Sequence, residues 1–418
     1  MKVLLRNAKI ISFNSPFNGQ SKDILIKNGI ISAINDEILT DVDQVIAIPG
    51  LHVSEGWTDC FADFSDPGFE SKETLASGSS AAAAGGFTGV MLLPNSNPVV
   101  QGKSGVEYLI RSAASLPVSL YPIGAVTQNC NGKELTEMYD MFRSGAVAFS
   151  DGHTSIQSAG MLLKALQYVL AFNGTVIQLP GDNSVGVGGL MNEGIISTRL
   201  GLPGIPSLSE YIQVERDIAL AEYTGSKIHF TGVSTEKTLS LILNAKESGI
   251  KVSFSVTPYH MYFCDEDLLG YNTYLKVSPP LRKRSDMMSI RNAAIEGKVD
   301  FIASHHHPQE WDAKTCEFEY AKTGMSNIEC VFGVAKVCGI DVNTFVQMQT
   351  SNIKKIFDLP IYPITEGTKA DLTLFDPGVS YQFEKKQIYS KSENNAFIGK
   401  AMEGKTFGII NGDKVFLP

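Results

Sequence analysis

The chain has 418 residues, of which 43% are hydrophobic and 19% charged, and its formal net charge is −9. This balance is that of an ordinary globular protein, and the length exceeds what one small core requires. The negative charge argues against nucleic acid or an anionic membrane as a partner. No apolar run approaches the roughly 20 residues that span a bilayer, and the N-terminal stretch is expected to form a strand rather than a signal peptide.

Six cysteines are scattered along the chain, and none of them forms a Cys-x-x-Cys pair. Such a distribution is typical of reduced and mostly buried thiols, not of a disulfide framework or a structural metal site. We therefore expect a cytoplasmic protein.

Both ends of the chain have β character. Residues 1–50 alternate short β-like runs with turns, and Asn28-Gly29 is a hairpin signal between two of these runs. After residue 360 the runs KADLTLFDP and FGIINGDKVFL read as strands again. The two ends thus differ from the segment between them.

Between residues 51 and 360 the pattern changes to strands that alternate with helices. This alternation continues for roughly 300 residues and predicts an α/β fold, a (β/α)₈ barrel of the TIM type. The strands we expect are GVMLLPN, VSLYPIGAV, AVAFSD, TVIQLPG, KIHFTGVS, KVSFSVTPYH and VDFIASHHHP.

The stretch WTDCFADFSDPG, residues 57–68, reads as a strand that runs into a loop, because Pro fixes φ and Gly frees it. Polar side chains at the carboxyl end of a barrel strand usually face the active site. The stretch resembles the metal-binding signature of the cyclic amidohydrolases, and of dihydroorotases in particular. In that signature Asp59 and the Asp-Pro-Gly ending are in place, but Phe61 and Asp63 stand where two metal histidines belong, and Ser65 replaces an arginine that grips the substrate carboxylate.

Further motifs of the same family follow along nearly the whole chain, including PNSNP, MNEG, LPGIP and SPPLR. The resemblance implies that Asn95, Ser278 and Arg282 contact the substrate, with Ser278 in place of an asparagine. By itself Asn95 is equally well read as a turn residue, since Asn-x-Asn-Pro is good turn chemistry. The C-terminal Gly-x-x-Ala-Asp-Leu motif resembles the strand by which family members rejoin their N-terminal β module. We therefore predict one composite β domain of residues 1–50 and 361–418 beside a barrel of residues 51–360.

The metal positions that the resemblance implies are mostly substituted. In AFSDG, Asp151 matches a metal ligand, although Asp-Gly after a strand is also a common turn. Gln178 and Gly232 stand where metal histidines belong, and His305 stands where the family has its general-base aspartate. Because neighbours on a strand point to opposite faces, His305 and His307 can share a face that His306 cannot join.

These substitutions leave Asp63, Asp151 and His305 as candidate ligands of a weak or vestigial metal site, with His305 also the candidate catalytic residue. A catalytic zinc needs about three protein ligands and an open position. We therefore expect no cofactor, or at most one weakly bound divalent metal such as zinc.

The leading hypothesis is an impaired pseudo-dihydroorotase of pyrimidine biosynthesis with a structural or regulatory role, for example beside aspartate carbamoyltransferase. The alternative is an active dihydroorotase, or a related cyclic-amide hydrolase, with a remodelled, mononuclear or metal-free site. A third possibility is a protein that binds a small ligand in the old pocket. A small-molecule pocket and assembly into a homo-oligomer are expected as well.

Overall fold

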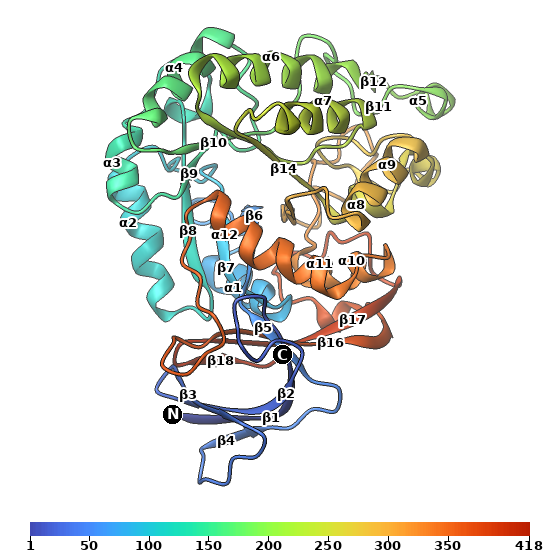
Figure 1. The fold of residues 1–418 in the computed structure, drawn as a ribbon. Helices are drawn as coiled ribbons and strands as arrows, with labels where there is room; N and C mark the ends of the chain where they lie inside the picture. Colours follow the sequence, from blue (N-terminus) through green and yellow to red (C-terminus); the bar gives the residue numbers. More distant parts are fainter.

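A computed structural model describes all 418 residues and contains two large β-sheets with helices packed around one of them (Figure 1). The first sheet contains strands from both ends of the chain, which both lie at the bottom of Figure 1. Its order is β18-β17-β16-β5-β1-β2-β3, with β4 paired to β1. Its strands are β1 (Lys2–Ile11), β2 (Ser21–Lys27), β3 (Ile30–Asn35), β4 (Gln44–Ile46), β5 (His52–Glu55), β16 (Asp371–Gln382), β17 (Ala401–Asn411) and β18 (Lys414–Phe416).

The second sheet has eight strands in the order β15-β14-β13-β10-β9-β8-β7-β6, and every neighbouring pair is parallel. It confirms the predicted α/β barrel. A separate two-stranded pair, β11 (Met191–Asn192) and β12 (Gly204–Ile205), lies in a later loop. The barrel strands are β6 (Trp57–Ala62), β7 (Phe87–Leu92), β8 (Ser119–Gly124), β9 (Ala148–Phe149), β10 (Thr175–Gln178), β13 (Lys227–Phe230), β14 (Val252–Val256) and β15 (Phe301–Ile302).

Twelve α-helices connect or follow these strands, and local capping sets several of their ends. Ser158 and Thr235 accept hydrogen bonds from backbone N–H groups in the first turns of α4 and α7, while Gly225 ends α6 in the left-handed conformation. The helices are α1 (Leu75–Ala84), α2 (Lys103–Ser112), α3 (Met138–Arg143), α4 (Ala159–Leu170), α5 (Ile195–Leu200), α6 (Leu208–Thr224), α7 (Glu236–Glu247), α8 (Pro258–Tyr262), α9 (Arg284–Ile295), α10 (Val331–Val337), α11 (Val342–Gln347) and α12 (Ile353–Ile356). None of them combines the length and apolarity needed to cross a bilayer.

The segment KVSFSVTPYH differs from its prediction as a single strand. Strand β14 ends at Val256, and the short helix α8 begins at Pro258. The Thr257 side chain accepts a hydrogen bond from the His260 N–H, and proline is well suited to the first helical turn because it has no N–H to leave unpaired. This local capping outweighs the β propensity of the preceding residues.

The terminal sheet packs against the barrel through a cluster of aromatic rings. Trp57, at the start of β6, contacts Phe87, Phe332, Phe345 and Phe375 with ring centroids 4.9–6.2 Å apart. Phe375 belongs to β16, so the cluster joins the two sheets. The division into residues 1–50 with 361–418 and residues 51–360 stays a prediction; in the structure β5 pairs with β1 and β16 of the terminal sheet.

Side-chain and loop hydrogen bonds join the two outer strands of the barrel sheet. The Asp59 carboxylate in β6 accepts hydrogen bonds from the Ser304 N–H (2.8 Å) and hydroxyl (2.5 Å), just after β15. The Asp63 N–H then donates to the His306 carbonyl at 2.8 Å. Asp59 is fully buried, and burial raises its pKa to about 6 despite these hydrogen bonds. The barrel therefore closes through a carboxylate and a loop contact.

Replacing Asp59 tests this closure. Asp59→Ala leaves the Ser304 N–H and hydroxyl buried without an acceptor, so we expect the free energy of unfolding to fall by roughly 2–4 kcal/mol. The matched control is Asp36→Ala, which removes an exposed carboxylate paired with Lys22 and should change stability by less than about 1 kcal/mol. Urea denaturation followed by circular dichroism measures both changes. Equal stability of the two variants would show that Asp59 does not hold the barrel closed.

Candidate metal centre and pocket

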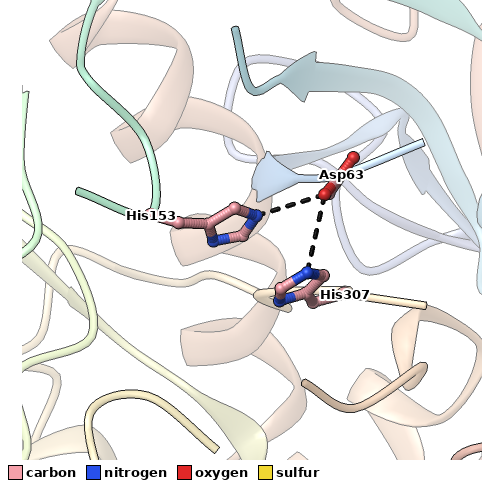
Figure 2. Close-up of side chains that lie close together, drawn as sticks. All are labelled: Asp63, His153 and His307. Carbon is pink, nitrogen blue, oxygen red and sulfur yellow. Dashed lines mark hydrogen bonds and ion pairs between the residues drawn. The ribbon is translucent and has the colours of Figure 1, made fainter. Parts of the chain in front are cut away.

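Three side chains converge where β6, β9 and β15 end (Figure 2). Asp63 directly follows β6, His153 lies in the loop after β9, and His307 lies in the loop after β15. The His153 Nε2 atom lies 3.1 Å, and the His307 Nε2 atom 3.7 Å, from Asp63 Oδ2. The two imidazole rings are stacked with centroids 4.0 Å apart. One donor atom from each residue falls within 4.8 Å of the others, so the three can share one ion.

Neighbouring polar groups hold the three donors in place. Asp63 Oδ1 accepts a hydrogen bond from the Ser65 N–H at 2.7 Å, which leaves Oδ2 toward the histidines. The His153 backbone N–H donates to Asn95 Oδ1 at 3.2 Å, and Gln309 Nε2 lies 3.1 Å from His307 Nε2. The Ser65 and Asn95 contacts position Asp63 and the loop of His153 before an ion binds, whereas Gln309 contacts the nitrogen of His307 that faces Asp63.

The charge states of the cluster suit a divalent cation. Burial alone would raise the pKa of Asp63, but the His153 hydrogen bond, the nearby imidazoles and the Ser65 N–H hold that pKa well below its usual range. Burial, together with the neighbouring His153, lowers the pKa of His307. Two imidazoles and one carboxylate form a donor set that catalytic zinc uses, with a position left for a further ligand. The residues present therefore fit a divalent ion.

The expectation of no cofactor, or of at most one weakly bound zinc, is wrong. It rested on counting substituted positions, whereas His153 and His307 complete a three-donor site with Asp63. Both histidines stand outside the motif positions that the resemblance singled out. Their position in the sequence could have identified them, because each lies four or five residues after a barrel strand, in a loop at the carboxyl end of the barrel.

Asp151 lies close by in sequence, but its carboxylate is used elsewhere. Its oxygens accept hydrogen bonds from the N–H groups of Val126 (3.0 Å) and Thr127 (2.8 Å) and from the Thr127 hydroxyl (2.5 Å). It is not among the three converging donors. The structure thus gives Asp151 a role in holding the loop after β8, and a role as ligand stays a prediction.

His305 lines the pocket without joining the donor cluster. It adopts a left-handed backbone conformation (φ 48°), its Nε2 lies 2.7 Å from the Thr231 hydroxyl, and its ring packs at a tilt against Phe61 with centroids 4.6 Å apart. Burial and, to a lesser extent, the nearby His260 lower the pKa of the His305 imidazole, which favours its neutral form. His305 and His307 both line the cavity, whereas His306 turns away to Glu73, as predicted; the predicted reason does not hold, because the three histidines lie in the loop after β15 and His305 has a left-handed backbone.

Other substituted positions are filled by contacts within the protein. Gln178 donates to Asp217 Oδ2 at 3.1 Å and to a loop carbonyl, and a Cβ atom at Gly232 would meet the His305 ring at 2.7 Å. Neither position offers a donor to the cluster. Packed side chains therefore occupy the surroundings of Gln178 and Gly232.

The cavity beside the donors has a volume of about 200 Å³. A second hollow of about 200 Å³ shares three lining residues with it, so the two are adjacent. The first cavity is lined by Phe61, His153, Leu179, Tyr259, Ser278, His305, His307, Thr323 and Gly324.

The three predicted substrate contacts lie around this space in different ways. Ser278 lines both hollows. Asn95 is used between loops: its Nδ2 donates to the Asp151 carbonyl at 3.2 Å, and its Oδ1 accepts from His153. Arg282 borders only the second hollow and is buried against Glu210, with Nη2 to Oε2 at 3.2 Å. Their substrate contacts stay predictions.

Comparison with known proteins agrees with this geometry. A dihydro-orotase-like family profile matches residues 53–238. A dihydroorotase of Pelotomaculum thermopropionicum is 35% identical and aligns over 100% of this chain and 99% of its own length. A dihydroorotase of Syntrophus aciditrophicus is 35% identical over 97% of this chain and 96% of its own. The chain belongs to the dihydroorotase family.

Solved structures support the same fold at lower sequence identity. The L-hydantoinase (dihydropyrimidinase) from Arthrobacter aurescens superposes with a TM-score of 0.86 at 19% identity, over 99% of this chain and 95% of that one. The dihydropyrimidinase from Brevibacillus agri superposes with a TM-score of 0.83 at 19% identity, over 100% of this chain and 95% of that one. The family resemblance stated from the motifs is therefore confirmed, and this dihydroorotase-family member places an Asp-His-His cluster at the barrel mouth.

Metal analysis tests the cluster. We expect the native protein to bind one zinc per chain, and His153→Ala or His307→Ala to weaken the affinity at least about tenfold. His52→Ala, in β5 of the terminal sheet, is the matched control and should keep the full affinity. Elemental analysis together with chelator-competition titration measures stoichiometry and affinity. Wild-type affinity in both cluster variants would rule out this site.

Proposed function

We propose that the chain is a hydrolase of cyclic amides of the dihydroorotase type with a remodelled single-metal site. The observation that carries the proposal is the convergence of Asp63, His153 and His307 beside a cavity at the carboxyl end of the barrel. That end is where barrel enzymes place their active sites. Family membership supports the class of substrate, since relatives that align over the full length are named dihydroorotase.

In this proposal Asp63, His153 and His307 hold one divalent ion. Such an ion, when bound, polarises a carbonyl group and activates water at neutral pH. Ser65 and Asn95 keep Asp63 and His153 in position through their hydrogen bonds. Phe61, Leu179 and Tyr259 form an apolar wall that excludes bulk water from the reacting ring.

His305 is the residue that we propose to accept a proton. Its imidazole lines the cavity, and the Thr231 hydroxyl at 2.7 Å fixes the ring orientation. A positioned histidine is the side chain most often used for such transfer. This assignment replaces the aspartate that the family resemblance implies at the same position.

The setting of the activity also stays a proposal. Full-length likeness to named dihydroorotases supports a place in pyrimidine metabolism. A cytoplasmic location, assembly into a homo-oligomer and contact with aspartate carbamoyltransferase are expectations from the sequence and its resemblance.

Ring-opening assays test the proposed activity. With one zinc or manganese ion per chain, we expect turnover of a dihydropyrimidine ring, measured by loss of ring absorbance and by chromatography of the ring-opened product. His307→Ala should abolish it, and His52→Ala should leave it unchanged, because only the first removes a proposed ligand. A fully metal-loaded protein that opens neither dihydroorotate nor dihydrouracil would favour the non-catalytic alternative.

The role of His305 has its own test. His305→Asn keeps a polar side chain but removes the proton acceptor, so we expect kcat to fall by about 10²–10⁴-fold with little change in KM. Metal content, measured in the same samples, should stay at one ion per chain because His305 is outside the cluster. Unchanged kcat in this variant would exclude His305 as the proton acceptor.

A further inference from the structure

No lysine or arginine side chain lines the cavity beside the donor cluster. Its nine lining residues include three hydrophobic residues, and the others are histidines, hydroxyl residues and a glycine. The Asp63 carboxylate lies at its edge, in contact with the lining residues His153 and His307. A ligand carboxylate would therefore meet no cationic lysine or arginine here, and the positive charge of the proposed ion serves the reacting carbonyl group and water.

The guanidinium that borders the second hollow already makes hydrogen bonds through all three of its nitrogen atoms. Arg282 Nη2 lies 3.2 Å from the Glu210 carboxylate, Nε donates to Ser234 Oγ at 3.0 Å, and Nη1 donates to Asn192 Oδ1 and the Ile205 carbonyl at 3.2 Å. Its side chain is 2% exposed, and that of Glu210 is fully buried. Breaking this buried pair to bind another carboxylate would leave Glu210 without its partner, which is strongly unfavourable.

The ammonium group of Lys314 is also committed to the protein. It acts electrostatically on His307, but its Nζ donates to the carbonyls of Thr273 at 3.0 Å and Lys276 at 3.4 Å. The lysine side chain is buried in the loop after β15 and does not line the cavity. It is therefore not placed to receive an acidic ligand.

The remaining walls suit a small uncharged ring. Phe61 and Tyr259 offer aromatic surfaces and Leu179 an aliphatic one, while Ser278 and Thr323 provide hydroxyls. The volume of about 200 Å³ is below the roughly 300–1,000 Å³ of pockets for drug-sized ligands, so it matches a single ring. Amide N–H and C=O groups of a ring pair with hydroxyls, whereas a buried, unpaired carboxylate pays a large desolvation cost.

We infer that the substrate is an uncharged cyclic ureide, a dihydropyrimidine ring without a carboxylate substituent. The inference rests on the proposed hydrolase function and narrows its substrate. In the reaction, water adds to a ring carbonyl, the C–N bond of the ring amide breaks, and the nitrogen takes one proton of the water. The product is an open chain with a ureido group and one new carboxylic acid, which loses the second proton to solvent to give a carboxylate, and no reactant besides water is consumed.

A matched pair of rings tests the inference. 5,6-Dihydrouracil and dihydroorotate differ only in the ring carboxylate, so the zinc-loaded protein is titrated with each in a calorimeter and assayed for turnover. We expect dihydrouracil to be preferred at least tenfold in affinity, and in kcat/KM where turnover occurs. Equal binding of both rings, preference for dihydroorotate, or binding of neither ring would overturn the inference.

The two readouts separate this inference from the proposed function. Turnover of dihydroorotate in preference to dihydrouracil would support the proposed hydrolase function and contradict the inference of an uncharged substrate. Preferential binding of dihydrouracil without any turnover would support an uncharged ligand for the pocket and contradict the hydrolase function.

A variant adds the missing charge directly. Ser278→Arg places a guanidinium where both hollows meet and should shift the affinity ratio toward dihydroorotate at least tenfold relative to the wild type. Ser278→Gln is the control, because it is long and polar but neutral, and it should not produce that shift. An identical ratio in the arginine and glutamine variants would show that charge does not select the ring.

Discussion

The structure depends on the contact that closes the barrel between its first and last strands. Asp59 and Ser304 join β6 to the segment after β15. Four residues after Asp59, the Asp63 N–H donates to the His306 carbonyl. These bonds replace a regular ladder between the two strands. They also bring the residue after β6 and the loop after β15 into contact, which is the condition for Asp63 and His307 to lie near each other.

The donor cluster is therefore built at the seam of the barrel. His153 reaches it through the loop after β9, where Asn95 accepts a hydrogen bond from the His153 backbone N–H. The Ser65 N–H binds one oxygen of Asp63, and the other oxygen faces the histidines. Asp63 stands where the family motif has a histidine, and its carboxylate is still a possible metal donor. The two imidazoles of the cluster come from His153 and His307, which lie in loops after β9 and β15. The resulting donor set, two imidazoles and a carboxylate, is one that catalytic zinc uses.

The rest of the barrel mouth has been repacked around that change. Phe61 packs against His305, His305 occupies the space beside Gly232, and Gln178 bonds to Asp217. Arg282 is bound by Glu210 and its neighbours in a buried network. These contacts give the buried polar groups partners within the protein and leave two adjacent small hollows beside the cluster.

The sequence by itself determined the barrel, the family and the place of the site. The alternation of strands and helices and the strand-end position of Asp63 depend on local patterns, which a sequence shows directly. Alternation also predicted that His306 is separate from its two neighbours, although in the structure the path of the loop after β15, and not a strand, separates them.

Only the tertiary structure decided which donors meet. His153 and His307 lie 154 positions apart in the chain and reach Asp63 through loops whose paths no periodicity encodes. The same holds for Asp151 and Arg282, which match their motif positions but whose polar atoms are taken by Thr127 and Glu210. A motif specifies a residue type at a position, whereas its chemistry depends on the partners that folding brings within hydrogen-bond distance.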